Sequence, residues 1–414
     1  MQTRGPFYKQ LWFQTLVSIV VGAGVGFATN GESAEWFGWM GTIFVRLLKM
    51  VIVPLILTSI VTGVASVGTG KTLGRLGAKT LTYYMATSLA AILTGLVLVN
   101  ALRPGVGADL VDTKGADLPE LTTVGGVSDI FYRMIPTNPI SAMASGDMLA
   151  IIFFAILLGV GIAHLPSGKD RTLRDLFEQG FELMMLLTSG IIRLLPLGVL
   201  GLISTAVAKS GAGTLQAVGL YAVTIVAGLA VHMLVTLPLF LFLLGRMSPL
   251  RHYRNMAEAM ITAFSTSSSS ATLPVTIRSV RERVGASNQV TSFVLPMGAT
   301  INMDGTALYE CVGAIFIAQV LGVDLSFAQQ ATVVVTALLA SIGAAGIPSA
   351  GLVMIFLVTE AVGLKGPEVA TIVGIMLAVD RPLDMLRTMV NITSDSVGAA
   401  IIAKSEGESE VNAA

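Results

Sequence analysis

The sequence contains one cysteine, three histidines and few charged residues. Cys311 stands alone, so an intramolecular disulfide and a cysteine-based metal site are both excluded. The histidines, His164, His232 and His252, are scattered along the chain, and we predict that each is a polar residue of an interface or loop. Charged residues make up 12% of the 414 residues and the formal net charge is zero, which argues against nucleic-acid binding.

Hydrophobic residues make up 54% of the chain, and the mean hydropathy is +0.80. Soluble domains carry about 25% charged residues, so the composition predicts an integral membrane protein. The 44 glycines are typical of closely packed and broken membrane helices. A long apolar segment follows Arg4 and Lys9 without a small-residue cleavage site, which predicts a first membrane span and not a removable signal peptide.

A membrane span needs about 20 apolar residues. We predict eight spans: Leu11–Ala28, Gly41–Val67, Leu76–Leu102, Ile130–His164, Leu173–Val207, Gly213–Leu244, Ser292–Leu321 and Glu368–Ala403. The fourth is interrupted by Pro136 and Pro139, so we expect it in several short pieces. Basic residues occupy alternate loops, which predicts a multi-pass protein with both termini in the cytoplasm. We expect it in the inner (plasma) membrane.

Two further apolar stretches do not fit full crossings. Ala257–Val275 has basic residues on both flanks and a serine run, Ser267–Ser270, at its centre. Ala331–Thr359 has no basic flank and a glycine-rich centre, Ser341–Gly351. We predict that both form re-entrant helical hairpins, at about 257–283 on the inner side and about 325–365 on the outer side. Interrupted segments entered from opposite sides are typical of an inverted-repeat transporter.

The last predicted span carries a polar stripe. Its members recur at steps of four, three, four and four and so share one helix face: Asp380, Asp384, Arg387, Asn391 and Asp395, with Thr388 beside them. An ionised group at mid-membrane costs about 3 kcal/mol or more, so the stripe must face other protein or a water-filled cavity. The alternative is a purely structural salt-bridge helix.

Arg387 and Asp384 suit a small zwitterion with an acidic side chain. The Arg387 guanidinium can bind a carboxylate with two parallel hydrogen bonds, and Asp384 can pair with an ammonium group. The hydroxyls of Ser268–Ser270 and the backbone amides of Gly346–Gly351 are available for a second carboxylate. The alternative is that Asp384 and Arg387 pair only with each other, at i and i+3.

Two aspartates, Asp304 and Asp395, have no evident basic partner near them in the sequence. Side-chain or carbonyl oxygens that can join them come from Gly298, Thr300, Asn302 and Asn391. Oxygen ligands with one carboxylate per site suit a monovalent cation, Na⁺ first. A protonated aspartate, with H⁺ as the coupling ion, is the alternative.

Four motifs, in this order, resemble the glutamate/aspartate transporter family, the dicarboxylate/amino acid:cation symporters. They are Ser267–Pro274 (SSSSATLP), Asn302–Thr306 (NMDGT), Ala340–Pro348 (ASIGAAGIP) and Asp384–Asn391 (DMLRTMVN). The resemblance covers essentially the whole chain and suggests a prokaryotic member. It implies a membrane-embedded homotrimer, not an enzyme, that takes up L-aspartate and/or L-glutamate with Na⁺ by elevator-type alternating access.

The resemblance also implies roles for individual residues. Substrate would be bound by Ser268, Ser269, Thr306, Gly351, Asp384, Arg387, Thr388 and Asn391. One sodium site would use Gly298, Asn302, Asn391 and Asp395, and a second Tyr84, Thr87, Ser88, Asn302 and Asp304. A third would use carbonyls of Thr300, Ser341, Ile342 and Ala344, and Met303 is also among the expected metal ligands.

The family architecture implies a division of the chain into two kinds of domain. The scaffold would comprise 1–75 and 129–210, and the transport domain 76–128 and 211–405. We predict that the tail, 406–414, is disordered because it is polar.

The chain departs from the family at the second arginine. Archaeal members carry it at the position of Ser267 and animal carriers at that of Met385, whereas this chain has Arg381 one turn before Asp384. Glu310 occupies the position of the animal glutamate linked to proton co-transport, which predicts that it carries a proton or permits K⁺ counter-transport.

Four alternatives to Na⁺-coupled uptake can be weighed from the residues. A proton-coupled glutamate/aspartate symporter differs only in the coupling ion. Asp384, which suits an ammonium group, argues against a C4-dicarboxylate symporter. Gates predicted on both sides favour a carrier over a channel. The serine run has no histidine or lysine placed near it, which argues against an intramembrane serine hydrolase.

Overall fold

The protein is described from a computed structural model, which covers residues 11–29, 33–65, 71–108, 110, 135–145, 147–166, 171–210, 212–343, 350–408 and 411. All regular elements in these ranges are helical, which confirms the all-α prediction for this part of the chain. The first half comprises α1 (Leu11–Ala28), α2 (Ser33–Ala65), α3 (Lys71–Leu102), α5 (Pro139–Ser145), α6 (Met148–Ala163), α7 (Arg171–Ile192), α8 (Leu195–Ser210) and α9 (Ala212–Val231).

The second half contains shorter helices and one very long one. It comprises the π-helical turn η2 (His232–Thr236), α10 (Leu237–Gly245), α11 (Pro249–Thr266), α12 (Ser269–Ser279), the π-helical turn η3 (Val280–Val284), α13 (Asn288–Ile301), α14 (Asp304–Val320), α15 (Phe327–Gly343), α16 (Ala350–Ala361) and α17 (Pro367–Ser405). The 39 residues of α17 extend about 58 Å at 1.5 Å per residue.

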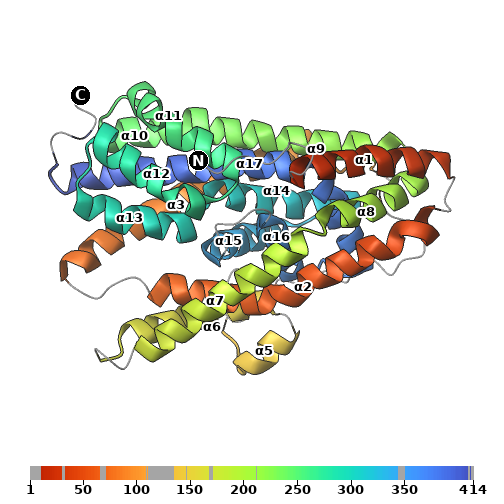
Figure 1. The fold of residues 1–414 in the computed structure, drawn as a ribbon, viewed down its shortest axis with the longest axis horizontal. Helices are drawn as coiled ribbons and strands as arrows, with labels where there is room; N and C mark the ends of the chain where they lie inside the picture. Colours follow the sequence, from red (N-terminus) through yellow and green to blue (C-terminus); the bar gives the residue numbers. More distant parts are fainter. Residues whose placement is uncertain are drawn as a thin grey trace.

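Helices α2, α6 and α7 lie together along one side, and α10 to α13 gather at one end of the molecule (Figure 1). The long helix α17 packs against α8, α9, α11, α13 and α14. Its residues from Val390 to Ala403 are buried on every side, as expected for a helix at the centre of a bundle.

Two helical stretches within the described residues are long and apolar enough to cross a bilayer, judged by length and composition alone. They are Arg75–Leu102, of 28 residues, and Gln216–Gly245, of 30 residues. They coincide with the predicted spans Leu76–Leu102 and Gly213–Leu244. The full set of eight spans and the re-entrant hairpins remain predictions.

Helix breaks occur near three of the positions that the sequence suggested. The predicted fourth span is divided into α5 and α6, and α11 ends where the serine run begins. Ser267 closes α11 in the left-handed region, at φ 51°, and the Ser268 hydroxyl accepts a hydrogen bond from the Ala271 amide to start α12. The glycine-rich centre of the second predicted hairpin lies largely outside the described residues.

Two predicted boundaries were wrong. Leu173–Val207 is not one helix: it divides into α7 and α8 at Arg193–Leu194, because Pro196 lacks an amide hydrogen and fits only the first turn of a new helix. In the seventh span, Ser292–Leu321, the glycine of the Asn302–Thr306 motif predicts an unwound break at Gly305. The break lies instead at Asn302–Met303, and Gly305 belongs to the first turn of α14.

The start of the C-terminal tail is ordered, which corrects the predicted disorder at residues 406 and 408. Glu406 forms ion pairs with Arg75 and Lys79, both at 2.6 Å. Glu408 accepts hydrogen bonds from the Ser287 amide and hydroxyl, at 2.8 and 2.5 Å. The hydrogen bonds from Lys79 and Arg75 hold the pKa of Glu406 below its ordinary value. These contacts tie the end of α17 to α3 and to the start of α13.

Glycines allow α8 to approach α1 and α2 closely. A Cβ added at Gly26 would lie 2.7 Å from the Ser204 carbonyl oxygen, and one at Gly41 would lie 2.5 Å from the Leu202 side chain. A Cβ at Gly201 would overlap the Phe37 carbonyl oxygen. Backbone atoms cannot move aside as a flexible side chain can, so Gly26 and Gly201 require glycine.

We therefore expect Gly201→Ala to destabilise the protein by about 1–3 kcal/mol, the usual cost of overpacking. The measurement is thermal unfolding of the purified protein in detergent. Gly24→Ala is the matched control, because a Cβ there has no neighbour within 4 Å among the described residues. Equal melting temperatures for the two variants would show that position 201 does not require glycine.

Candidate functional site

The polar stripe of α17 is buried against α13 and α14. Its members are at most 5% exposed: Asp380, Asp384, Arg387, Asn391 and Asp395. Hydrogen bonds connect Asn391 to the start of α14 and Asp395 to the residue that follows α13. The prediction that the stripe faces other protein or a cavity is confirmed. Burial against polar partners is how ionised groups are tolerated in such an interior.

Arg387 is the centre of the first cluster. Its Nη2 donates to Asp384 Oδ1 at 2.7 Å and to Asp380 Oδ1 at 3.1 Å. The guanidinium carbon lies 3.8 Å from the ring centroid of Tyr309 on α14, a cation–π contact. Within the described residues, Nε and Nη1 have no hydrogen-bond partner. A buried arginine therefore keeps unused donors on Nε and Nη1, which lie on opposite sides of the guanidinium.

Gly351, at the start of α16, leaves room beside these donors. A Cβ at Gly351 would lie 3.0 Å from Arg387 Nη1 and 3.0 Å from the Thr306 methyl group. Three of the predicted substrate-binding residues, from α14, α16 and α17, are thus brought together. The open side of the guanidinium faces the one position in this group that has no side chain.

Asp384 is bound from two sides. Its Oδ1 accepts from Arg387, and its Oδ2 lies 3.5 Å from Arg381 Nη1. The pairing of Asp384 with Arg387 that the i, i+3 spacing suggested is therefore present. Two arginines and two aspartates, with Asp380 as the second acid, balance in charge. Thr388 is buried, and its hydroxyl donates to the Asp384 carbonyl oxygen at 2.8 Å.

Asn391 connects the stripe to the first turn of α14. Its Oδ1 accepts from the Gly305 amide at 2.8 Å, and its Nδ2 donates to the Thr306 hydroxyl at 3.3 Å. A Cβ at Gly305 would lie 2.9 Å from the Arg387 carbonyl oxygen. Gly305 is thus required for close approach of two helices, and not for the helix break that the sequence suggested.

Asp395 is the centre of a second cluster. Asn302 Nδ2 donates to Asp395 Oδ1 at 2.9 Å and to the Ser394 hydroxyl at 3.0 Å. A Cβ at Gly298 would lie 2.5 Å from Asp395 Oδ1 and 2.7 Å from the Tyr84 hydroxyl oxygen. Asn302 Oδ1 is buried and has no hydrogen-bond partner within the described ranges. This oxygen and the carboxylate are the kind of hard ligands that bind a monovalent cation.

Asp304 is the centre of a third cluster. The Ser88 hydroxyl donates to Asp304 Oδ1 at 2.6 Å, and the Thr87 hydroxyl lies 3.4 Å from the same oxygen. His232 Nε2 donates to Asp304 Oδ2 at 3.0 Å. All four side chains are at most 1% exposed. The structure therefore groups the predicted Thr87, Ser88 and Asp304 and adds a histidine to them. Tyr84, predicted for this site, lies closer to Asp395.

The prediction that all three histidines are interfacial or loop residues was wrong for two of them. His232 is fully buried on Asp304, and His252 is fully buried with its Nε2 2.9 Å from the Ser396 hydroxyl. His164 is exposed at the end of α6, as predicted. One signal was visible in the sequence: His232 is a lone titratable residue inside the apolar span Gly213–Leu244, which calls for a buried partner.

The third predicted ion site is only partly described. Ser341 is fully buried and donates to the Leu338 carbonyl oxygen at 2.9 Å, while Ile342 packs in the same apolar cluster as Ile301. Thr300 donates to the Met297 carbonyl oxygen at 3.0 Å. Met303 is buried ahead of α14, and Ala344 lies outside the described residues. The ends of α13 and α15 are thus close, since the two helices pack together.

The serine tip, Ser268 and Ser269, is not connected to the arginine cluster by hydrogen bonds within the described residues. Ser269 is 3% exposed, and Ser268 caps α12, which packs against α17. Neither forms a hydrogen bond with Arg387 within the described residues.

Glu310, on α14, is fully buried, and neither of its carboxylate oxygens has a hydrogen-bond partner in the described part of the chain.

Comparison with known proteins gives a family match over almost the whole chain. The family model described as the sodium:dicarboxylate symporter family matches residues 11–405. Mouse excitatory amino acid transporter 3 is 36% identical over 456 residues, covering 96% of this chain and 86% of that protein. The Escherichia coli proton/glutamate-aspartate symporter is 34% identical over 410 residues, covering 96% of this chain and 92% of that protein.

The Asp304 cluster yields a prediction for His232. In His232→Leu, Asp304 Oδ2 loses its donor, and an unsatisfied buried acceptor costs about 1–3 kcal/mol. We expect a lower melting temperature for His232→Leu than for His232→Gln, whose amide can still donate. Thermal unfolding in detergent is the measurement. Equal melting temperatures for the two variants would show that the hydrogen bond does not matter for stability.

Proposed function

Because the chain belongs to the sodium:dicarboxylate symporter family, we propose that it is a secondary active symporter for acidic amino acids, L-aspartate and/or L-glutamate, driven by Na⁺. The relatives named as excitatory amino acid transporters and as a glutamate-aspartate symporter support the substrate class. The observation that carries the proposal is the buried Arg387 guanidinium, whose Nη1 lies beside Gly351 and has no hydrogen-bond partner within the described residues.

Substrate recognition follows from the charges around Arg387. Nη1, which lies beside Gly351, binds the side-chain carboxylate of the substrate, and the Tyr309 ring packs on the guanidinium plane. Asp384 binds the substrate ammonium group, and Arg381 remains beside its other oxygen. A neutral amino acid would leave the buried guanidinium without its carboxylate, so acidic substrates are preferred.

Cation binding follows from the two remaining carboxylates. Within the described residues, neither Asp304 nor Asp395 pairs with an arginine or lysine. Na⁺ at Asp395 uses the unpartnered Asn302 Oδ1, and Na⁺ at Asp304 uses the oxygens of Ser88 and Thr87. The tautomer of His232 with its proton on Nε2 satisfies the hydrogen bond to Asp304 and avoids a buried Nδ1–H without an acceptor.

Coupling arises because cations and substrate use the same broken segment. Asn302 lies in the break between α13 and α14 and contacts the Asp395 site, while Gly305 and Thr306, three and four residues later, contact Asn391 of the substrate site. A cation that orders Asn302 also fixes the first turn of α14, and substrate does the same from the other side. Reciprocal stabilisation of one segment is a coupling free energy between two sites.

The remaining features of the proposal come from the family architecture. We infer a homotrimer in the plasma membrane, with cytoplasmic termini, inverted repeats and elevator-type movement of the transport domain against a scaffold. The glycine-dependent packing of α1, α2 and α8 supports a rigid scaffold. The break at Ser267–Ser268 supports the first of two re-entrant hairpins as a gate, and the second hairpin is inferred from the family architecture.

A proton is the second candidate for the coupling ion. Glu310 is fully buried without a hydrogen-bond donor in the described residues, a setting in which an ionised carboxylate is costly. The Escherichia coli relative is named as a proton/glutamate-aspartate symporter. A proton on Glu310, or K⁺ on the return step, would then accompany the sodium ions.

The first functional prediction concerns Arg387. We expect Arg387→Cys to weaken aspartate binding by about 100-fold or more, since a lost partner of a buried ion pair costs 3–5 kcal/mol, while ²²Na⁺ binding persists. Arg387→Lys keeps the charge but not the planar guanidinium and should also lose aspartate. Arg171→Gln, which removes an exposed arginine at the start of α7, is the control and should retain binding. Retained aspartate affinity in both Arg387 variants would refute the role of Arg387 in substrate binding.

The substrate class can be tested by competition against aspartate. Stronger competition by succinate than by glutamate would favour a C4-dicarboxylate carrier.

The second functional prediction concerns Glu310. In Glu310→Gln the proton can no longer leave, so we expect uptake of aspartate into proteoliposomes to lose its dependence on external pH or on internal K⁺. Exchange of internal for external aspartate should persist, because the substrate and sodium sites are intact. The same pH and K⁺ dependence in wild type and variant would show that Glu310 has no part in ion coupling.

A further inference from the structure

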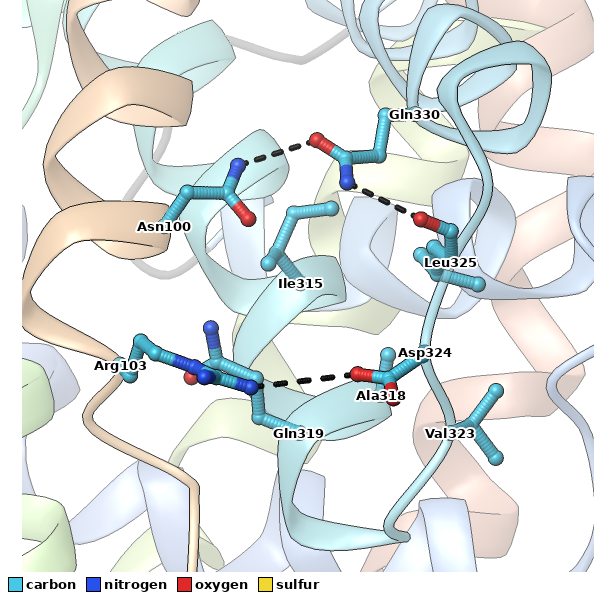
Figure 2. A pocket seen from close by; sticks show the side chains of 9 residues that line it. All are labelled: Asn100, Arg103, Ile315, Ala318, Gln319, Val323, Asp324, Leu325 and Gln330. Atoms are coloured by element: carbon cyan, nitrogen blue, oxygen red, sulfur yellow. Dashed lines mark hydrogen bonds and ion pairs between the residues drawn. The ribbon is translucent and has the colours of Figure 1, made fainter.

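A small polar pocket lies at the end of α3, away from the buried clusters (Figure 2). Its walls come from the last turn of α3, the last turns of α14, and the α14–α15 link with the start of α15. The volume is about 180 Å³, room for about six water molecules at about 30 Å³ each. Pockets for drug-sized ligands begin at about 300 Å³, so this one suits a very small solute.

Amide side chains form a fixed frame around the pocket. Asn100 Nδ2 donates to Gln330 Oε1 at 3.0 Å, and Gln330 Nε2 donates to the Leu325 carbonyl oxygen at 3.1 Å. Gln319 Nε2 donates to the Val99 carbonyl oxygen at 3.0 Å, and its Oε1 accepts from the Gly105 amide at 3.1 Å. The frame joins α3, α14 and α15 through neutral side chains. Its hydrogen bonds fix the shape of the pocket.

Among the described residues, the only charged ones in the pocket lining are Arg103 and Asp324, and their ion pair is weak. Their nearest atoms are 3.9 Å apart, too far for a hydrogen bond, and their side chains are 59% and 102% exposed. Exposed pairs of this kind contribute little to stability, so a ligand can separate them easily. Figure 2 shows the two side chains pointing toward each other below the Asn100–Gln330 bridge, with Ile315 between the two bridges.

The backbone of Arg103 is strained. Its φ is 47°, in the left-handed region that is unfavourable for non-glycine residues. The Arg103 amide donates to the Val99 carbonyl oxygen at 3.0 Å, and its carbonyl oxygen accepts from the Val106 amide at 3.2 Å, and these two bonds hold the turn. A strained turn that presents a weakly paired guanidinium to a pocket is a reason to look for a ligand there.

We propose that this pocket is a second, weak binding site for an α-amino acid zwitterion. The ligand carboxylate binds the Arg103 guanidinium, and its ammonium group binds Asp324, with the Asn100 carbonyl oxygen pointing into the same space. One positive and one negative group side by side match the two charges of an amino acid backbone, so recognition does not depend on the amino acid side chain. The lining contains a single carboxylate, already beside Arg103, so binding here does not need Na⁺.

A ligand in the pocket would connect the end of α3 to the start of α15. This goes beyond transport by the buried site, because the pocket shares no residue with the Arg387, Asp395 or Asp304 clusters. The pocket can therefore bind a zwitterion whether or not the buried site transports acidic amino acids.

The test is saturation-transfer NMR of glycine with the full-length protein in nanodiscs, in sodium-free choline buffer. We expect a saturable glycine signal, and weaker signals for acetate and methylammonium, each of which carries only one of the two charges. Arg103→Gln and Asp324→Asn should each weaken glycine binding by about fivefold or more. Arg171→Gln is the matched control, because Arg171 forms a similar exposed pair with Asp175 at 4.0 Å.

Two further variants distinguish glycine binding in the pocket from aspartate binding at the buried site. Arg387→Cys should keep the glycine signal, since the buried site plays no part in it. The Arg103→Gln/Asp324→Asn double variant should lose glycine while still binding aspartate in sodium, which also shows that it is folded. The inference is overturned if wild type gives no saturable glycine signal, or if the signal persists unchanged in the double variant.

Discussion

Burial of charge along α17 is the constraint on which the rest of the structure depends. Asp380, Asp384, Arg387 and Asp395 lie on one face of a helix that is enclosed by protein, where an uncompensated charge would be costly. Two arginines balance the first two aspartates. Asp395 and, across the interface on α14, Asp304 have no arginine or lysine partner among the described residues. In the proposed mechanism, mobile cations complete the charge of these two carboxylates.

The break between α13 and α14 is the second element of the account. Unwinding at Asn302–Met303 frees side-chain oxygens that a continuous helix would direct elsewhere, and it places Asp304 at the first position of α14. Gly298 and Gly305 flank the break, and a Cβ at either would collide with Asp395 or with the backbone of Arg387. Irregular backbone deep in a membrane protein is tolerated where it lines a site, and here it lies between the proposed substrate and ion sites.

Much of the helical pattern and of the site composition could be predicted from the sequence. The 3.6-residue period revealed the buried face of α17, and the serine run marked the end of α11. Contacts between distant segments could not be predicted from spacing. His232 meets Asp304 across 72 residues, because the π-helical turn that begins at His232 lies beside α14, and nothing local encodes that approach. The same holds for Glu406 with Arg75 and Lys79, and for the close contact that Gly305 permits.

The most direct test of charge compensation is uptake of radiolabelled aspartate into proteoliposomes, with gradients of Na⁺, H⁺ and K⁺ imposed one at a time. If cations complete the charge of Asp304 and Asp395, an inward Na⁺ gradient drives accumulation of aspartate, and purified protein binds aspartate far more weakly when choline replaces sodium. Equal binding in sodium and choline, together with no accumulation under a pH gradient, would contradict the account.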